Sequence, residues 1–239
     1  MDKRIAYSIV IPAYNEAENV ERALRETAAV FDPLAKEYEI IVVDDGSSDG
    51  TAGIVSSLSA ELPAVRLLRH AANGGKGKAV RTGVMNAQGE SILFLDCDLA
   101  THPREALSFI EKMEDFDIAI GTRRHAGSII ARSQPWYRVL YGRAINFFIR
   151  HLVKLPYYDT QCGFKMFRAE AAKDIFGELG PSRWTFDVEL LMRARSNGYL
   201  IAELPVTWTN GKTSRVRAGE VISDLFYLWR LKQRMDKQL

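Results

Sequence analysis

The chain has 239 residues, 47% of them hydrophobic, which is enough to bury a substantial core and excludes a protein that is disordered throughout. Its formal net charge of +2 is too small to indicate a nucleic-acid-binding protein. Two cysteines, Cys97 and Cys162, are too few for a disulfide framework, so we expect reduced thiols in a cytosolic protein. No apolar run approaches the roughly 20 residues of a spanning helix, so we expect no membrane crossing.

Short apolar runs alternate with helical patterns from residue 6 to residue 120. Asn15 and Glu18 have the spacing of a capping box for the first helix. The alternation predicts an α/β fold with a mostly parallel, Rossmann-like sheet and helices on both faces. Strands are expected at 6–11, 40–43, 65–68, 91–95 and 117–120, and helices at about 17–31, 50–59, 76–87 and 103–114.

Polar motifs follow several of these strands, at the edge where ligands of such sheets bind. Asp96 and Asp98 come directly after the buried strand at 91–95. Carboxylate oxygens are hard ligands that suit Mg²⁺ or Mn²⁺, and such ions complete their shell with substrate phosphates and water. The motif therefore predicts a metal site for a phosphorylated substrate. The alternative is a strand end whose aspartates cap the next helix.

Three further motifs have both a functional and a structural interpretation. Residues 12–16 can bind a ligand or merely form a turn. The carboxylates of Asp44 and Asp45 can accept a hydrogen bond from a base N–H or a ribose hydroxyl, or belong to a plain loop. Residues 73–78 do not match the phosphate-loop patterns, although their glycines and lysines at a helix start can face an anion.

After Arg123 the sequence no longer predicts clean strand–helix pairs, so we place a soft boundary near residue 122. It divides a single domain, 1–239, into a nucleotide-binding half, 1–122, and an acceptor half, 123–239. Basic residues without any intervening acid indicate an anion or a membrane surface as partner. They are Arg123, Arg124, Arg132, Arg138, Arg143, Arg150 and Lys154.

Two helices are expected in the second half. A helix at 135–152 would carry Trp136, Arg143, Phe147 and Arg150 on one stripe, which favours an interfacial helix on a membrane over a core or oligomer helix with paired arginines. A C-terminal helix at 220–235 has an apolar side and a basic end. It can pack on the core, form a homo-oligomer or contact anionic lipid.

Four segments, 10–16, 42–47, 73–77 and 96–98, resemble in order and spacing those of the family 2 glycosyltransferases. These enzymes have the GT-A fold and transfer the sugar with inversion at the anomeric carbon. Segments 159–165, 183–191 and 203–208 are similar to the dolichyl-phosphate glucosyltransferase branch. The resemblance covers about residues 5–230. It implies transfer of glucose from UDP-glucose to a polyprenyl phosphate, with Mg²⁺ or Mn²⁺, by a peripheral protein on the cytoplasmic face of a membrane.

The sequence departs from this pattern in two ways. We expect no membrane anchor, although one is common in that branch, and Ala100 and Thr101 stand where mannosyl enzymes place a metal-binding Gln. We therefore assign no third side-chain ligand. The alternatives are a family 2 enzyme with a glycan or protein hydroxyl acceptor, a polyprenyl-phosphate mannosyltransferase that uses GDP-mannose, and a non-catalytic binding module.

Site residues follow from these hypotheses. Asp96 and Asp98 would hold the metal, and Arg123 would contact a phosphate. Asp187 is the base if the acceptor is a hydroxyl, and otherwise a helix N-terminal acid. A phosphate monoester needs no base, because it is already largely a dianion at neutral pH. Expected donor contacts are Pro12, Tyr14, Glu16, Asp44, Asp45, Lys76, Cys97 and, by resemblance, Arg215 in a late loop; expected acceptor-phosphate contacts are Arg132, Arg138, Arg143 and Gln161.

Overall fold

The computed structural model describes residues 4–132, 147, 149, 151–180, 185–209 and 218–235. In this part of the chain seven strands form one sheet in the order β3-β2-β1-β4-β7-β5-β8, and β6 pairs with β9 in a second, two-stranded sheet. The strands are β1 (Tyr7–Ala13), β2 (Tyr38–Asp44), β3 (Val65–Arg69), β4 (Ser91–Leu95), β5 (Ile118–Thr122), β6 (Ile129–Arg132), β7 (Phe164–Arg168), β8 (Ile201–Pro205) and β9 (Thr207–Thr209).

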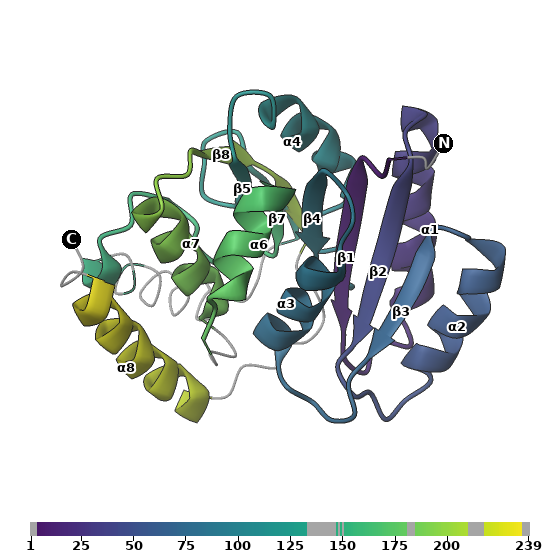
Figure 1. Ribbon diagram of the computed structural model, residues 1–239, viewed down its shortest axis with the longest axis horizontal. Coiled ribbons are helices and arrows are strands. Elements are labelled where there is room, and N and C mark those ends of the chain that lie inside the picture. The colour runs from purple at the N-terminus through teal and green to yellow at the C-terminus, as the bar shows by residue number, and fades with distance from the viewer. Residues whose placement is uncertain are drawn as a thin grey trace.

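Helices cover both faces of the large sheet, with α3 and α6 in front and α1 behind in Figure 1. The α-helices are α1 (Val20–Phe31), α2 (Thr51–Glu61), α3 (Lys76–Asn86), α4 (Ala106–Lys112), α6 (Ala169–Gly177), α7 (Phe186–Ser196) and α8 (Ala218–Met235). Short 3₁₀ turns precede α4 at Pro103–Glu105 and follow α1 at Asp32–Leu34.

The central strands are continuous apolar runs because both of their faces are buried. Side chains of successive residues alternate between the faces, so Ile9 and Val10 belong to different core clusters. One cluster packs under α3, α6 and α7, and the other packs under α1, α2 and α4. The predicted α/β class and mostly parallel sheet are confirmed.

One strand contradicts the expectation for the second half of the chain. β7 lies between β4 and β5 and is antiparallel to both. It is followed directly by α6, so a clean strand–helix pair does occur after Arg123. The pattern was missed because Lys165 interrupts the apolar run, and this lysine is fully buried. Both halves of the chain therefore contribute to one sheet.

The predicted capping box is also wrong. α1 begins at Val20 rather than near residue 17, and Asn19 occupies the N-cap position without a side-chain cap. Asn15 has a positive φ of 52°, and its Oδ1 accepts a hydrogen bond from Ser48 N at 2.9 Å. Asn15 thus joins two loops at the sheet edge instead of starting a helix.

α8 forms as predicted and begins two residues earlier than expected, at Ala218. It lies beside α7 at the end of the molecule farthest from β3 (Figure 1). Leu228 and Leu231 are buried, whereas Trp229 is 45% exposed, so Trp229 lies on the outer face. The predicted interfacial helix at 135–152 falls mainly outside the described residues. Among the described residues, no helix has the length and apolar character needed to cross a membrane.

Candidate active site

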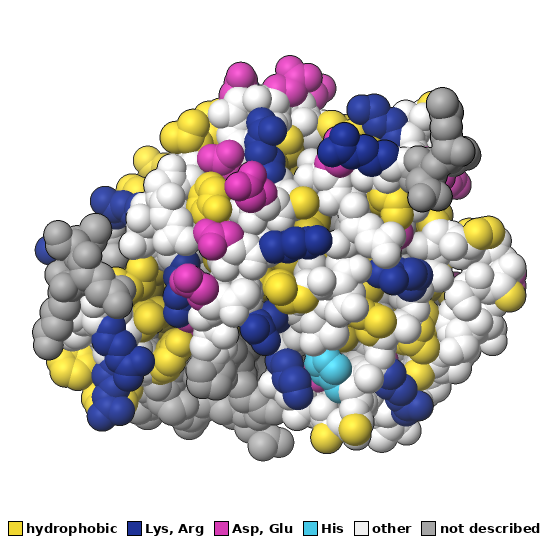
Figure 2. All heavy atoms as spheres, in the orientation of Figure 1, with side chains coloured by type: hydrophobic (Ala, Val, Ile, Leu, Met, Phe, Trp, Pro, Cys, Tyr) yellow, Lys and Arg dark blue, Asp and Glu magenta, His cyan; other side chains and the backbone are white. Residues whose placement is uncertain are grey.

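Loops that follow β1 and β2 are joined to each other at the carboxyl edge of the sheet, which is the lower edge in Figure 1. Asn15 N donates to Ser47 Oγ at 2.9 Å, and Glu16 N donates to Thr51 Oγ1 at 2.9 Å. These bonds fix the backbone of residues 12–16 against the loop after β2. Figure 2 shows lysine and arginine side chains around a histidine along this edge of the displayed face.

Asp45 holds the glycine-rich loop in place. Its carboxylate accepts hydrogen bonds from Gly74 N at 2.9 Å and Gly75 N at 2.7 Å, and His70 Nδ1 lies 2.7 Å from Oδ1. The other ring nitrogen of His70 lies 2.9 Å from Thr82 Oγ1 on α3. Asp45 is therefore a link between β2 and the start of α3, a role that the sequence did not reveal.

Asp44 is fully buried yet incompletely bonded. Its Oδ1 accepts from Ser47 N at 3.0 Å. Arg69 Nε lies 3.0 Å from Oδ2 but does not form a hydrogen bond with it, so that contact is an ion pair only. Buried carboxylate oxygens are normally hydrogen-bonded. Oδ2 of Asp44 therefore makes no hydrogen bond among the described residues and has only the ion pair with Arg69.

Lys76 and Asp96 meet at the centre of this edge. Lys76 is the first residue of α3, and its Nζ lies 2.5 Å from Asp96 Oδ1. Both side chains are 35% exposed, so a ligand can reach the pair. Burial opposes the charge on Lys76, but the carboxylates of Asp96 and Asp187 outweigh it and raise the pKa of Lys76. The aromatic rings of Phe94 and Phe186 lie 5.9 Å and 6.0 Å from the same ammonium group.

Gly163 packs against the Asp96 carboxylate on the side of Oδ2. A Cβ atom added to Gly163 would lie 2.0 Å from Asp96 Oδ2 and 2.6 Å from its Cγ. The Asp96 carboxylate therefore occupies the space that any other residue at 163 would fill. Lys76 and Gly163 together determine where the first carboxylate of the D-x-D motif lies.

Asp98 completes the motif. Its Oδ1 accepts from Ala100 N at 3.0 Å, across a turn in which Leu99 has a positive φ of 53°. Burial and the charge of Asp96 raise the pKa of Asp98, so the two carboxylates repel each other. Arg22 Nη2 donates to the backbone oxygen of Asp98 at 2.8 Å.

A divalent cation fits this pair of hard oxygen donors and would relieve their repulsion. No set of three or more His, Cys, Asp or Glu side chains suited to a metal occurs in the described residues. Mg²⁺ and Mn²⁺ commonly bind through one or two carboxylates and complete their shell with water and substrate phosphates. Two carboxylates at the end of β4 are consistent with that mode.

Arg123 lies at the end of β5 in a tight pair with Asp159. Its Nε donates to Oδ2 at 2.6 Å, its Nη2 donates to Oδ1 at 2.9 Å, and its backbone N donates to Oδ2 at 3.1 Å. The Trp208 ring lies 5.5 Å from the guanidinium carbon. Burial alone would raise the pKa of Asp159, but Arg123 outweighs it and lowers this pKa to about 2.

Asp187 forms an ion pair with a buried lysine. Lys165 Nζ donates to Asp187 Oδ1 at 2.5 Å and to the backbone oxygen of Cys162 at 2.6 Å, and its side chain is fully buried. Asp187 lies in the first turn of α7 and is 4% exposed. Buried charges are seldom tolerated unless they are paired. The Phe94 ring, already near Lys76, lies 5.3 Å from Lys165 as well.

A match to one protein family covers most of the chain. Residues 8–176 match the family model described as glycosyl transferase family 2. This chain belongs to glycosyltransferase family 2. The match confirms the predicted resemblance to this family.

Curated relatives of this glycosyltransferase narrow the comparison. A dolichyl-phosphate beta-glucosyltransferase of Trichomonas vaginalis is 36% identical over 226 residues, which cover 90% of this chain and 67% of the relative. The human dolichyl-phosphate beta-glucosyltransferase is 34% identical over 87% of this chain and 69% of the relative. The chain thus spans about two thirds of the length of these relatives.

Solved structures support the fold of the glycosyltransferase. TarS of S. aureus in complex with UDP superposes with a TM-score of 0.65 at 22% identity, over 95% of this chain and 65% of that chain. Glucosyl-3-phosphoglycerate synthase of Mycobacterium tuberculosis, in complex with Mn²⁺, UDP and phosphoglyceric acid, gives 0.64 at 17% identity, over 96% of this chain and 77% of that chain. At such identities the likeness concerns the fold alone.

Several predicted site residues of the glycosyltransferase gather at the sheet edge, and others lie outside the described residues. Arg138, Arg143 and Arg215 are outside them, and of Arg132 only the backbone, in β6, is described. Gln161 N donates to Asp159 Oδ1 at 3.3 Å, which places Gln161 beside the Arg123 pair. Cys97, which stands between the two aspartates in the sequence, is buried, and neither it nor Cys162 is in a disulfide.

Sequence reasoning missed Asp159, Gly163 and Lys165 as individual residues of the site. All three belong to the segment 159–165 that carried part of the family resemblance. An arginine predicted at a strand end could have prompted a search for a carboxylate partner, because buried guanidinium groups need one. Nothing in the sequence places Gly163 against Asp96, since that contact depends on the antiparallel insertion of β7.

Proposed function

We propose that this glycosyltransferase transfers glucose from UDP-glucose to a polyprenyl phosphate, with inversion at the anomeric carbon. The structural observation that carries the proposal is the D-x-D pair at the carboxyl end of β4, bordered by Lys76. The choice of sugar and acceptor is supported by relatives that are 34% and 36% identical and are named dolichyl-phosphate beta-glucosyltransferases.

In the proposed donor site, Asp96 and Asp98 hold Mg²⁺ or Mn²⁺. Such an ion neutralises the charge that develops on the departing diphosphate. Lys76 adds a positive charge at the same place. Oδ2 of Asp44, buried without a hydrogen bond, accepts from the base or ribose of the nucleotide. Residues 12–16 line the donor site, because their backbone is fixed against the loop that follows β2 through Ser47 and Thr51.

Arg123 is proposed to contact a phosphate with the part of its guanidinium that Asp159 leaves free. The hydrogen bonds to Asp159 use Nε and Nη2, and an arginine has five N–H donors in a planar fork. Asp159 holds that plane at the end of β5, so Arg123 is oriented before any substrate arrives. A cation that is fixed in advance stabilises developing charge without reorganisation.

The state of Asp187 favours a phosphate acceptor over a hydroxyl acceptor. A hydroxyl needs a carboxylate to remove its proton, and Asp187 is the residue predicted for that role. Its Oδ1 is already occupied by the Lys165 ammonium group, and the side chain is 4% exposed. A phosphate monoester, largely dianionic above its second pKa of about 6, attacks the anomeric carbon without such a base.

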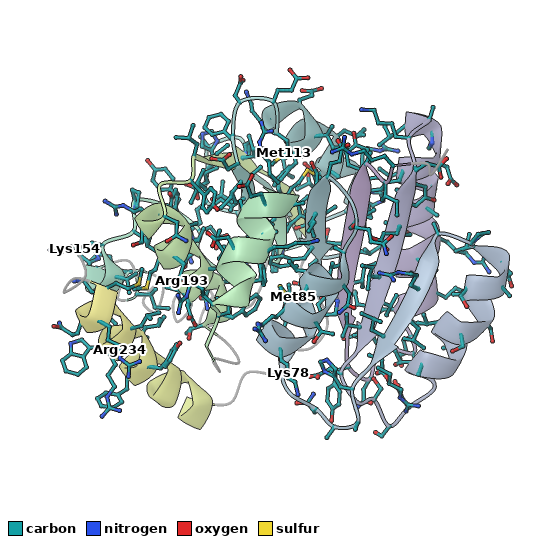
Figure 3. The ribbon with its side chains drawn as sticks, in the orientation of Figure 1. Lys78, Met85, Met113, Lys154, Arg193 and Arg234 are labelled. Atoms are coloured by element: carbon teal, nitrogen blue, oxygen red, sulfur yellow. The ribbon has the colours of Figure 1, made fainter. Side chains whose placement is uncertain are left out.

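Peripheral binding to a membrane is proposed through the outer face of α8. Phe226 and Trp229 are 51% and 45% exposed, and their rings stack with centroids 5.8 Å apart. The Arg230 guanidinium lies 4.3 Å from the centroid of Phe226. Arginine beside exposed aromatic rings suits the headgroup region of an anionic bilayer. Lys232 and Arg234 add to the basic end of the helix, and Figure 3 labels Arg234.

The proposed division of labour assigns the donor to residues 1–122 and the acceptor to residues 123–239. It is supported by the positions of Asp44, Lys76 and Asp96, which all lie in the first half. Arg123 and Gln161, which belong to the second half, lie beside each other at the sheet edge through Asp159.

A donor panel tests the proposal. UDP-glucose, other UDP-sugars and GDP-mannose would be offered with a short polyprenyl phosphate, with Mn²⁺ and with chelator. Transfer from UDP-glucose that stops on chelation is the expected result. Transfer from GDP-mannose alone would refute the donor assignment. Transfer only to a glycan hydroxyl acceptor, lost in Asp187→Asn, would favour the alternative acceptor.

A further inference from the structure

The ion pair between Lys76 and Asp96 joins two residues that the proposed function needs for different partners. Asp96 is a proposed metal ligand, whereas Lys76 is a proposed contact of the donor. Nζ of Lys76 lies 2.5 Å from Asp96 Oδ1, so the ammonium group is in direct contact with this oxygen. A metal ion bound to the same oxygen would stand about 2.1 Å from it. The ammonium group and the ion therefore compete for one place.

Asp96 has little freedom to serve both cations. Its Oδ2 lies against Gly163, at the place where a Cβ would be only 2.0 Å away. Oδ1 is thus the oxygen that faces the open side, and Lys76 covers it. The carboxylates of Asp96 and Asp98 repel each other, and the positive charge of Lys76 offsets this repulsion.

The surroundings of Lys76 allow its ammonium group to move. The side chain of Lys76 is 35% exposed, and Lys76 is the first residue of α3, with Gly75 and Gly77 on either side of it in the chain. Besides the ion pair with Asp96, Nζ lies over the faces of Phe94 and Phe186 at about 6 Å and is attracted by the carboxylate of Asp187. The two ring contacts are weak and do not fix the direction of the ammonium group. By contrast, Lys165 in the same region is fully buried between Asp187 and a backbone oxygen.

We propose that Lys76 is the internal counter-ion of the D-x-D carboxylates before metal binds, and that a divalent ion displaces its ammonium group from Asp96 towards the donor diphosphate. This inference rests on the proposed metal site. The exchange makes no covalent change: Asp96 Oδ1 gives up a hydrogen bond and gains a metal bond. Lys76 then couples binding of the metal to binding of the donor, because the metal frees the Lys76 ammonium group to contact the diphosphate.

Mn²⁺ binding without any turnover tests the exchange. Free Mn²⁺ would be measured by electron paramagnetic resonance in the presence of wild type, Lys76→Met, Lys76→Arg and Lys78→Met, first without nucleotide and then with UDP. Lys78 is the matched control, because it is an exposed lysine of the same helix turn and lies at the N-terminal end of α3 in Figure 3. Circular dichroism would verify that each variant is folded.

Lys76→Met should bind Mn²⁺ at least about tenfold more tightly than wild type when no nucleotide is present, because the competing cation is gone. The same variant should bind UDP at least about tenfold more weakly once loaded with Mn²⁺. Lys76→Arg should resemble wild type in Mn²⁺ affinity, and Lys78→Met should stay within about twofold of it.

Three results would overturn the inference while leaving the proposed metal site intact. The first is a Mn²⁺ affinity of Lys76→Met equal to or weaker than that of wild type. The second is an equal gain in Lys78→Met, which would reveal a general charge effect. The third is UDP binding by Mn²⁺-loaded Lys76→Met that matches wild type. If wild type itself binds no Mn²⁺, with or without UDP, the proposed metal site fails and the inference fails with it.

Discussion

Replacing Gly163 with alanine should inactivate the enzyme through Asp96 rather than through the fold. The added Cβ would lie 2.0 Å from Asp96 Oδ2, 2.6 Å from Cγ and 3.0 Å from Oδ1. Ordinary contacts of a Cβ begin at about 3.4 Å, so the carboxylate has to rotate away. That rotation also separates Asp96 Oδ1 from Lys76. Both features of the proposed metal site are disturbed by one methyl group.

The cost to stability should be small because two effects oppose each other. Gly163 does not have a positive φ, so alanine fits its backbone, and the loss of chain freedom in the unfolded state favours folding by about 0.4–1 kcal/mol. A displaced Asp96 rotamer costs about 0.5–1.5 kcal/mol. The net change in the free energy of unfolding should therefore stay within about 1 kcal/mol. Loss of one pre-positioned electrostatic group lowers turnover roughly 10²- to 10³-fold.

Glucosyl transfer to a short polyprenyl phosphate and urea unfolding would be measured together for Gly163→Ala. Gly177→Ala is the control, because a Cβ at that position meets nothing within 4 Å. We expect Gly163→Ala to lose at least about 100-fold in turnover while unfolding near the wild-type midpoint, and Gly177→Ala to stay active. Full activity of Gly163→Ala, or an activity loss matched by a loss of several kcal/mol in stability, would refute this reasoning.

Three further predictions concern the surroundings of the site. The pKa of Asp159 is lowered from 3.8 to about 2, so its charge contributes about 2 kcal/mol to the free energy of unfolding above pH 4, and this contribution is lost as the pH falls towards 2. In urea unfolding, the stability of Asp159→Asn should therefore depend less on pH than that of wild type between pH 4 and pH 2, and equal pH dependence of the two would contradict the pairing. Lys165→Met should lower the free energy of unfolding by about 3–5 kcal/mol, because it removes the buried ion-pair partner of Asp187. The double variant Lys165→Met with Asp187→Leu should recover most of that loss. A Lys165→Met variant as stable as wild type would be inconsistent with a structural pair. Joint replacement Phe226→Ser and Trp229→Ser should weaken sedimentation with phosphatidylcholine–phosphatidylglycerol vesicles at least about tenfold, with Gln233→Ser as control, and unchanged sedimentation would remove α8 from the membrane contact.

The regular part of the fold was readable from the sequence because the strands β1 to β4 contain short, mostly apolar runs and each is followed by a helical pattern. The rule that ligands bind at the carboxyl ends of strands then placed Asp44 and Asp96 at one edge. The antiparallel strand β7 was not readable. Its central lysine looks like a surface residue until its partner, Asp187, is known from the fold.

The types of site residue were predictable, but their partners were not. Two aspartates after a buried strand predict a cation site, with helix capping as the alternative until the motifs at the other strand ends are considered. The contacts that orient them come from Lys76 on α3 and Gly163 before β7, which approach Asp96 only when the sheet assembles. In the same way, Arg123 was expected to meet a phosphate, and its bidentate bond to Asp159 emerged only from the structure.

The central claim is that Asp96 and Asp98 hold a divalent ion on the diphosphate of UDP-glucose. The most direct measurement is glucosyl transfer to a short polyprenyl phosphate across a Mn²⁺ titration, for wild type and for Asp96→Asn. We expect wild type to be inactive in chelator and to saturate with Mn²⁺, and folded Asp96→Asn to be at least about 100-fold slower at every Mn²⁺ concentration. Wild-type transfer that persists in chelator, or an Asp96→Asn variant as fast as wild type, would contradict it.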